Sequence, residues 1–163
     1  MAETKNVYIL RDASADTVRT GKADIILHNG DIVAIGEKVD GVYKISAPTA
    51  ETKRFGIVYN ADVVTTAGKY RGLSDDPRDI EFPVGTIVNF YIPKKEDEVA
   101  ITVAEGYAKD TSKVVVPTAD ATGYTAKAAA GAEDKLVYDI TGEGFVSIGN
   151  ERVKTIELVC TLA

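Results

Sequence analysis

The sequence has little of several residue types on which common functional sites depend. Its 163 residues contain one cysteine, one histidine and no tryptophan. A single cysteine cannot form an intrachain disulfide, and one cysteine with one histidine leaves too few ligands for an ordinary zinc site. Cys160 lies in the apolar run IELVCTLA, which predicts a small buried side chain rather than a reactive thiol.

Long apolar stretches and a leader pattern are also missing. No run approaches the roughly 18 apolar residues that a transmembrane helix needs. The first residues, MAETKNVYIL, lack the basic region and apolar core of a secretory signal. We therefore expect a protein that is made and folded in a cytoplasm and has no membrane partner.

Clustered positive charge is scarce as well. The chain carries 19 basic and 25 acidic residues, for a net charge of −6 at pH 7. An acidic chain repels phosphate backbones, so nucleic-acid binding would require a local basic patch. The pair Lys94-Lys95 is followed at once by Glu96, Asp97 and Glu98. The sequence therefore predicts no nucleic-acid partner.

What the sequence does contain is short apolar runs with a period of two. Apolar and polar residues alternate in VGTIVNFYI, EVAITV, KLVYDI and TIELVCTL, as in half-buried strands. The composition, 45% hydrophobic and 27% charged, is that of a globular protein. We predict an all-β or mainly β protein, a small β-barrel or sandwich of short antiparallel strands with an extended N-terminal arm.

Glycine-containing dipeptides divide these runs. Asn29-Gly30 and Asp40-Gly41 are typical of tight hairpin turns. In the C-terminal part, Gly142, Gly144 and Gly149-Asn150 predict a series of short hairpins. Evidence for helices is thin. KAAAGAED, residues 127–134, predicts one turn or a short helix, and DASADTVRT, residues 12–20, could form a helical turn.

The same punctuation predicts the domain organisation. Residues 1–22 are expected to form the arm, and residues 23–163 a single β-rich domain. Within that domain, residues 23–66 carry a first set of strands, 67–82 a turn-rich connection, and 83–163 a second set.

One apolar patch stands out in the arm. Val7, Tyr8, Ile9 and Leu10 are consecutive apolar residues between polar flanks, and something must cover them. They could form a first strand of the same domain. Alternatively, they could add to a neighbouring subunit by strand augmentation or groove packing.

The candidates for chemistry are few, and each has a simpler interpretation. His28 adjoins an Asn-Gly dipeptide, which predicts an exposed turn rather than a catalytic base. The acidic cluster Asp75, Asp76, Asp79 and Glu81 lacks EF-hand spacing and predicts a solvated turn. TGEGFVSIG does not match a phosphate loop and predicts a turn between strands. Paired carboxylates for glycoside hydrolysis would need an aromatic-lined cleft, and aromatic residues make up only 7% of the chain. No catalytic residue, cofactor or metal is predicted.

A resemblance supplies the functional hypothesis. The stretch LHNGDIVAIGEKVDGVYKISAPTAETKRFGIVYNADVV combines an Asn-Gly turn, a short strand closed by Gly36, the run VYKISAPTA and a further apolar strand. With GKYRGLSDD, FPVGTIVNFYI and the final VKTIELVCTLA, this pattern resembles the head decoration, or cement, proteins of tailed bacteriophages. The likeness covers residues 24–92 and the last strand, and is weaker over 93–150. The arm is longer than the family pattern.

The resemblance implies a non-enzymatic virion protein that binds the outer surface of a capsid and stabilises it. Its implied partner is the major capsid protein, and a homo-oligomer on the capsid is expected. The alternative is a host-surface or glycan-binding module at a fibre base, which would expose aromatic side chains. Its candidates are Tyr43, Tyr59, Tyr70, Tyr91, Tyr107 and Tyr124. A carboxylate-dependent hydrolase is the third and weakest hypothesis.

Overall fold

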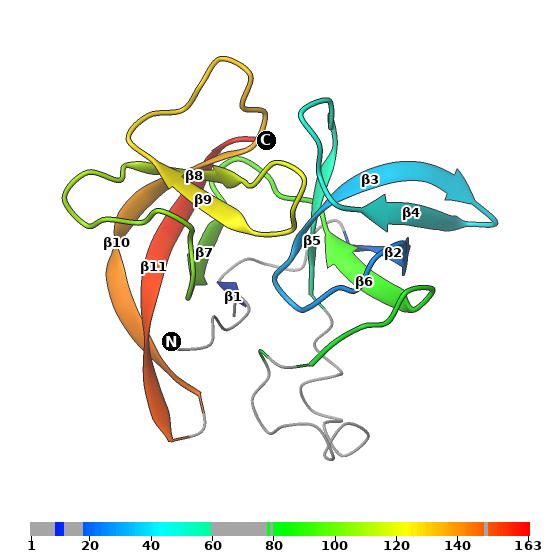
Figure 1. Cartoon of the computed structure of the whole chain (residues 1–163), viewed down its shortest axis with the longest axis horizontal. Coiled ribbons are helices and arrows are strands. Elements are labelled where there is room, and N and C mark those ends of the chain that lie inside the picture. The colour runs from blue at the N-terminus through cyan, green and yellow to red at the C-terminus, as the bar shows by residue number, and fades with distance from the viewer. Residues whose placement is uncertain (1–8, 12–17, 60–77, 79, 149) are drawn as a thin grey trace.

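A computed structural model describes residues 9–11, 18–59, 78, 80–148 and 150–163. These residues form a closed five-stranded β-barrel and a six-stranded sheet that lie side by side (Figure 1). The described chain is almost entirely β, so the predicted fold class is confirmed. Among the described residues, no helix has the length and apolar character needed to cross a membrane.

The barrel is built by the first half of the chain. Its strands are β2 (Val18–Ala23), β3 (Ile32–Val39), β4 (Val42–Ser46), β5 (Phe55–Val58) and β6 (Ile87–Tyr91). Their order around the barrel is β2-β4-β3-β5-β6, and β2 closes the ring by pairing with both β4 and β6. The β2–β4 pair is parallel, whereas the other barrel pairs are antiparallel.

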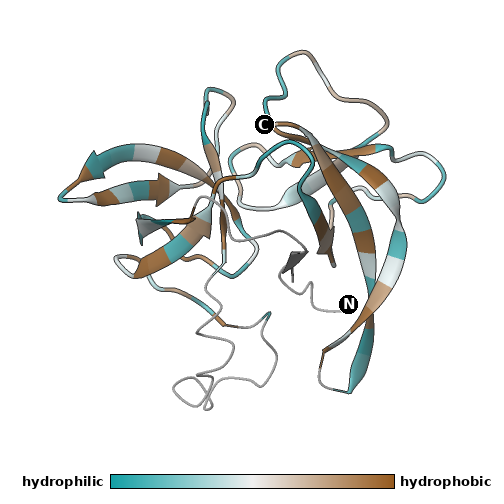
Figure 2. Ribbon diagram, turned by 180° about the vertical axis from the view of Figure 1, so that it is seen from behind, coloured by the Kyte–Doolittle hydropathy of each residue, from teal (hydrophilic) through white to brown (hydrophobic). Residues whose placement is uncertain are grey.

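The sheet is built mainly by the second half. Its strands are β1 (Ile9–Arg11), β7 (Glu98–Ile101), β8 (Val114–Pro117), β9 (Tyr124–Lys127), β10 (Val137–Ile148) and β11 (Glu151–Leu162). They are ordered β1-β7-β11-β10-β8-β9, and all neighbours are antiparallel. Figure 2 shows apolar and polar bands alternating along β10 and β11, as the period-two pattern predicts.

Two apolar clusters hold these units together. Inside the barrel, Phe90 fills the centre among Leu27, Val33, Ile45 and other buried residues. A second cluster joins the barrel to the sheet. It contains Ile32, Ile57 and Tyr91 from the barrel, and Val99, Ile101, Val115, Tyr124, Leu136, Tyr138, Ile156, Leu158 and Cys160 from the sheet side. Adjacent residues of a strand point to opposite faces, so Phe90 packs in the barrel cluster and Tyr91 packs in the cluster that joins the barrel to the sheet.

The predicted tight turns are present. Asp40 and Gly41, with φ of 52° and 83°, join β3 to β4 between the paired residues Val39 and Val42. Positive φ at both central residues is the geometry that favours Asp-Gly in two-residue hairpins. Gly30 also has a positive φ of 93°.

The prediction of short C-terminal hairpins is right for Gly149-Asn150, because Ile148 pairs with Glu151 across these two residues, and wrong for Gly142 and Gly144. Gly142 and Gly144 lie inside β10, a 12-residue strand that pairs with β11 through two register shifts, so TGEGFVSIG is mostly strand rather than turn. Glycine is found at these strand positions because side chains of the opposite strand occupy the space that a Cβ would need. A Cβ on Gly144 would lie 3.0 Å from Glu157 Oε1 and 3.1 Å from Thr155 Oγ1. These glycines make room for side chains of the opposite strand.

Three smaller expectations have mixed outcomes. Residues 128–134 contain a turn and no helix. Within this segment the Asp134 carboxylate accepts a hydrogen bond from the Gly131 N–H at 2.7 Å. Of the predicted helical turn at 12–20, residues 12–17 lie outside the described residues and 18–20 are strand. Residues 18–22, which the sequence assigned to the arm, lie within β2 of the barrel.

Candidate functional site: a groove between barrel and sheet

A groove of about 300 Å³ opens between the barrel and the sheet. The connection between β4 and β5 forms one wall, and β8, β9 and the segment before β10 form the other. The barrel wall consists of Pro48, Thr49, Ala50, Thr52 and Phe55, and the sheet wall of Val116, Pro117, Thr118, Ala119, Thr125, Lys127, Glu133, Asp134 and Lys135. The groove therefore combines apolar surface with several hydroxyl groups.

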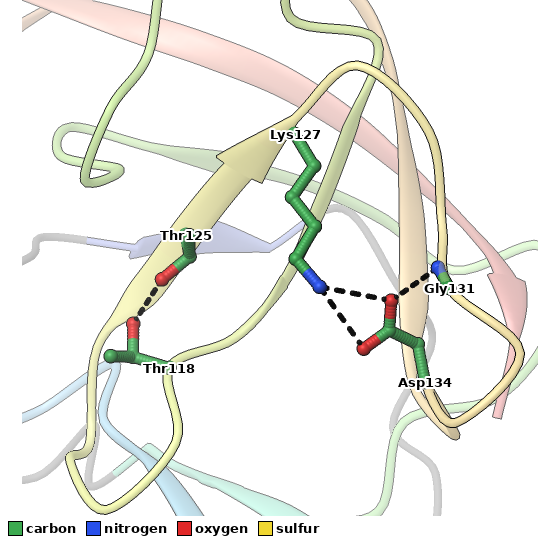
Figure 3. A network of polar contacts seen from close by, with 5 residues as sticks. All are labelled: Thr118, Thr125, Lys127, Gly131 and Asp134. Carbon is green, nitrogen blue, oxygen red and sulfur yellow. Dashed lines mark hydrogen bonds and ion pairs between the residues drawn. The ribbon is translucent and has the colours of Figure 1, made fainter.

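The sheet wall carries an ordered polar network (Figure 3). The Thr118 and Thr125 hydroxyls are hydrogen-bonded at 2.6 Å. Lys127 Nζ lies 3.2 Å and 3.4 Å from the two Asp134 carboxylate oxygens, and the Gly131 N–H donates to the same carboxylate. The antiparallel pairing of β8 with β9 brings the threonines together, and the turn at residues 131–134 brings Asp134 to Lys127.

A second depression of about 160 Å³ continues from the first and shares Phe55 and Lys135 with it. Its apolar lining comes from Ile35, Phe55, Ile92, Pro93 and Leu136. Its charged lining residues are Lys53, Arg54 and Lys135. Lys135 Nζ also donates to the Thr52 carbonyl at 3.3 Å. The chain is acidic overall, so three cations beside an apolar surface distinguish this end of the groove.

Several of the polar groups that line the groove are already paired with one another. A hydroxyl nucleophile needs a general base within hydrogen-bond reach. Here the two threonine hydroxyls bond to each other, and the lysine amine is held by a carboxylate. Among the described residues, no group of three or more His, Cys, Asp or Glu side chains could hold a metal ion.

His28 occupies a different position, in the turn where the barrel meets the sheet. Its side chain is 14% exposed, so the predicted exposed turn is wrong for this residue. Nδ1 lies 3.5 Å from the buried Asp31 carboxylate, and Nε2 lies 3.7 Å from Glu81. The contact with Asp31 raises the pKa of His28, against the opposing effect of burial.

The surroundings of His28 indicate a structural role. The His28 N–H donates to the Asp31 carboxylate at 2.8 Å. The next residues join the turn to the sheet side, because Tyr124 donates its hydroxyl to the Gly30 carbonyl and the Ile32 N–H donates to Thr122. The spacing of Asp31 three residues after His28 was visible in the sequence. The burial of the two side chains, which makes their contact significant, was not.

Other predicted residues fall at separate places. Cys160 is fully buried, as predicted, and burial raises the pKa of its thiol to about 11. Of the acidic cluster, Asp75, Asp76 and Asp79 lie outside the described residues, and Glu81 contacts His28. Neither Cys160 nor Glu81 lines the groove.

The apolar patch of the arm is only partly described. Ile9 and Leu10 belong to β1, which pairs antiparallel with β7 of the same chain, Ile9 opposite Ile101 and Leu10 opposite Ala100. Val7 and Tyr8 lie outside the described residues. The described part of the patch thus lies at an edge of the chain's own sheet.

The candidate tyrosines do not form one exposed surface. Tyr91 and Tyr124 are 1% and 3% exposed and belong to the core, and Tyr70 lies outside the described residues. Tyr43 packs edge-on against Phe90 at 6.1 Å, and Tyr59 is 39% exposed.

Tyr107 belongs to a polar network on the sheet that sequence reasoning missed. Its hydroxyl donates to Glu143, whose other carboxylate oxygen lies 2.9 Å from Lys154 Nζ. The bond to Glu143 raises the pKa of Tyr107 to about 12, while the bonds from Tyr107 and Lys154 lower the pKa of Glu143. The sequence offered no signal, because Glu143 and Lys154 meet through the pairing of β10 with β11 and Tyr107 reaches Glu143 from outside the strands.

Comparisons of this chain with protein-family models, with curated proteins and with solved structures returned no match.

Proposed function

We propose that this chain is a non-enzymatic structural protein of a virion, which binds the outer surface of a bacteriophage capsid and stabilises it. The proposal starts from the resemblance of residues 27–64 to head decoration proteins. Much of that stretch forms β3, β4 and β5 of the barrel. The resemblance therefore concerns a scaffold whose surfaces, rather than reactive groups, would perform the function.

The observation that supports this function most directly is an exposed apolar strip at one end of the barrel. We define the strip as Ile26, Val84 and Ile87, whose exposed fractions are 52%, 62% and 51%. Grouped apolar side chains on a surface are typical of interaction sites.

Main-chain pairing places the two segments that carry these residues side by side. Residues 23–27 run beside residues 82–87, with Leu27 and Phe82 exchanging N–H···O bonds of 3.0 Å and 2.7 Å. The Ala23 N–H donates to Thr86 at 2.9 Å. Ala23, Leu27 and Phe82 are buried in the barrel core and Ile25 packs against it, whereas the three strip residues are exposed.

The size of the strip suits a decoration protein. Three apolar side chains give only a modest affinity at a single site. Many identical sites on a capsid, and several copies in one oligomer, would strengthen attachment by multivalency. The partner in this proposal is the major capsid protein, and the net charge of −6 disfavours attachment to the genome.

Co-sedimentation with expanded capsids that lack the protein tests this function. We expect the wild type to bind, and a variant with Ile26→Asp, Val84→Asp and Ile87→Asp to lose binding at least tenfold. Val39→Asp is the matched control, because Val39 is 46% exposed at the far tip of the β3–β4 hairpin. Failure of the wild type to bind would overturn the proposal, and equal binding by the triple variant would remove the strip from it.

The groove favours a second candidate, a host-surface or glycan-binding module. Its threonine hydroxyls, its lysine–aspartate pair and the neighbouring Phe55 provide hydrogen bonds and an apolar surface for a sugar. A glycan array would show hits for the wild type that weaken in Thr125→Val and persist in the strip variant. An array at background level would remove this candidate.

A further inference from the structure

The outer halves of β10 and β11 form a two-stranded ribbon, defined here as residues 142–148 and 151–155. Strand β8 pairs with β10 only at Tyr138 and Asp139, with one further bond from the Ile140 N–H to Lys113. Strand β7 pairs with β11 at 156–159. Within the described part of the chain, the ribbon residues therefore pair only with one another, and Figure 1 shows the ribbon extending past the other strands.

Side-chain contacts hold this ribbon in place. Arg78, itself 4% exposed, makes an ion pair of 2.9 Å with Glu151 near the ribbon tip. Lys154 and Glu143 pair across the two strands at 2.9 Å. A two-stranded ribbon is marginal in water by itself, so these contacts give it a defined position.

The two long edges of the ribbon differ in charge. The β11 edge carries Glu151, Arg152 and Lys154 within five residues. Charged residues of this kind are what natural proteins place on open edges to prevent pairing. The β10 edge, residues 142–148, reads GEGFVSI and contains one charge, Glu143, which Lys154 and Tyr107 already bind. The charges therefore protect the β11 edge against pairing with another strand, whereas the β10 edge lacks this protection.

The β10 edge also carries an exposed aromatic ring. Phe145 is 58% exposed, and its only contact among the ring interactions of the described residues is the Arg152 guanidinium, 4.1 Å from the ring centre. In Figure 1 the ribbon lies at the margin of the molecule, and its two strands cross toward the tip.

We propose that the β10 edge from Gly142 to Ile148 pairs with the same edge of a second copy of this chain, antiparallel and related by a two-fold axis. An antiparallel edge is self-complementary under such an axis. The near absence of free charge lets two acidic chains approach here. The register centred on Phe145 brings the two exposed rings opposite each other and sets Gly144 opposite Val146. The charged β11 edge stops further addition, so the product is a closed dimer.

The hydrogen-bonding phase of the ribbon allows a sharp test. Ile148 and Glu151 are the paired residues nearest the connection at 149–150, and we expect this closing pair to exchange hydrogen bonds, as in a two-residue hairpin. In that phase the next pair, Ser147 with Arg152, directs its N–H and C=O groups outward. Proline at Ser147 removes a donor from the β10 edge, and proline at Arg152 removes one from the β11 edge, with the ribbon's own bonds retained in both.

Sedimentation analysis of the full chain over a range of concentrations measures the result. We expect the wild type at twice the chain mass of 17.4 kDa. Ser147→Pro should raise the dimer dissociation constant at least tenfold. Arg152→Pro should be as dimeric as Arg152→Ala, which removes the same guanidinium contact with Phe145 but keeps the N–H. Circular dichroism melts establish that each variant is folded. The dimer does not depend on the capsid role, because only the purified chain is used.

A second variant covers the case in which Ser147→Pro does not fold. Phe145→Lys places two positive charges across the two-fold axis and should also give the monomer, whereas Val39→Lys on the barrel should not. A wild type that is monomeric at every concentration overturns the proposal. A dimer that survives both edge variants, or that is kept in Arg152→Ala and lost in folded Arg152→Pro, overturns it as well.

Discussion

The barrel and the sheet differ in whether their strand edges are paired. In the barrel, β2 pairs with β4 on one side and β6 on the other, so the strands form a closed ring. In the sheet, β10 and β11 extend beyond their neighbours, and their outer halves pair only with each other among the described residues. Closure removes edges, whereas extension exposes them. The first arrangement favours stability, and the second makes a surface available for association.

The glycines of the two regions show the same contrast. Gly21 and Gly56 lie against the barrel core, where an added Cβ would lie 2.9 Å from Ile45 Cγ2 and 2.6 Å from Phe90 Cδ2 respectively. Gly144 in the sheet would meet the ends of the Glu157 and Thr155 side chains at 3.0 Å and 3.1 Å. The same residue type therefore accommodates a rigid aromatic ring in one region and mobile side-chain ends in the other.

The largest expected effect comes from opening the barrel. Removal of residues 1–22 deletes all of β2 except Ala23 and exposes edges of β4 and β6. Removal of residues 1–17 takes away only β1 among the described strands. We expect the longer deletion to abolish cooperative thermal unfolding and the shorter one to retain it, as measured by circular dichroism. Similar melts for the two deletions would contradict the importance of closure.

A smaller effect compares single glycines. Gly56→Ala places a methyl group against Phe90 and should lower the free energy of unfolding by about 1–3 kcal/mol, as overpacking does. Gly144→Ala meets side-chain ends that can move, and should cost less than about 1 kcal/mol. Urea denaturation measures both. A larger loss for Gly144→Ala would reverse the comparison between the regions.

The smallest effect concerns His28 at the junction of the two regions. Its pKa is raised in the folded state, chiefly by Asp31, so it binds a proton more tightly when folded. That contribution is fully present below the unfolded pKa near 6.5 and is lost as pH rises through the folded pKa. We expect the stability of the wild type to fall across this window, relative to His28→Gln, by about 1 kcal/mol or less. Urea denaturation at several pH values checks the sign, and a difference that grows with pH would refute it.

Much of the barrel could be predicted from local patterns. The alternation in residues 84–92 predicted a strand there, with Val88 and Phe90 on one face, and both are buried. Asp40-Gly41 predicted the β3–β4 turn because only a few residue types tolerate positive φ. The burial of Cys160 followed from its apolar neighbours. These features depend on residues that are close in the chain.

The groove and the ribbon could not be predicted in this way. Thr52 and Lys135 meet across the groove although they are 83 residues apart. Gly142 and Gly144 indicated turns, but their function depends on Glu157 and Thr155 of the opposite strand. His28 looked exposed beside Asn-Gly, yet its turn is packed against the sheet. In each case the deciding neighbour is distant in sequence.

The β class, the alternation of buried and exposed residues, the tight turns, and the shortage of ligands and thiols for metal or disulfide chemistry could all be read from the chain before folding. These follow from local backbone preferences and from composition. The closure of one set of strands, the open edges of the other and the groove between them became visible only in the folded chain. Strand pairing and burial are set by contacts between distant residues, and those contacts determine which side chains remain available to a partner.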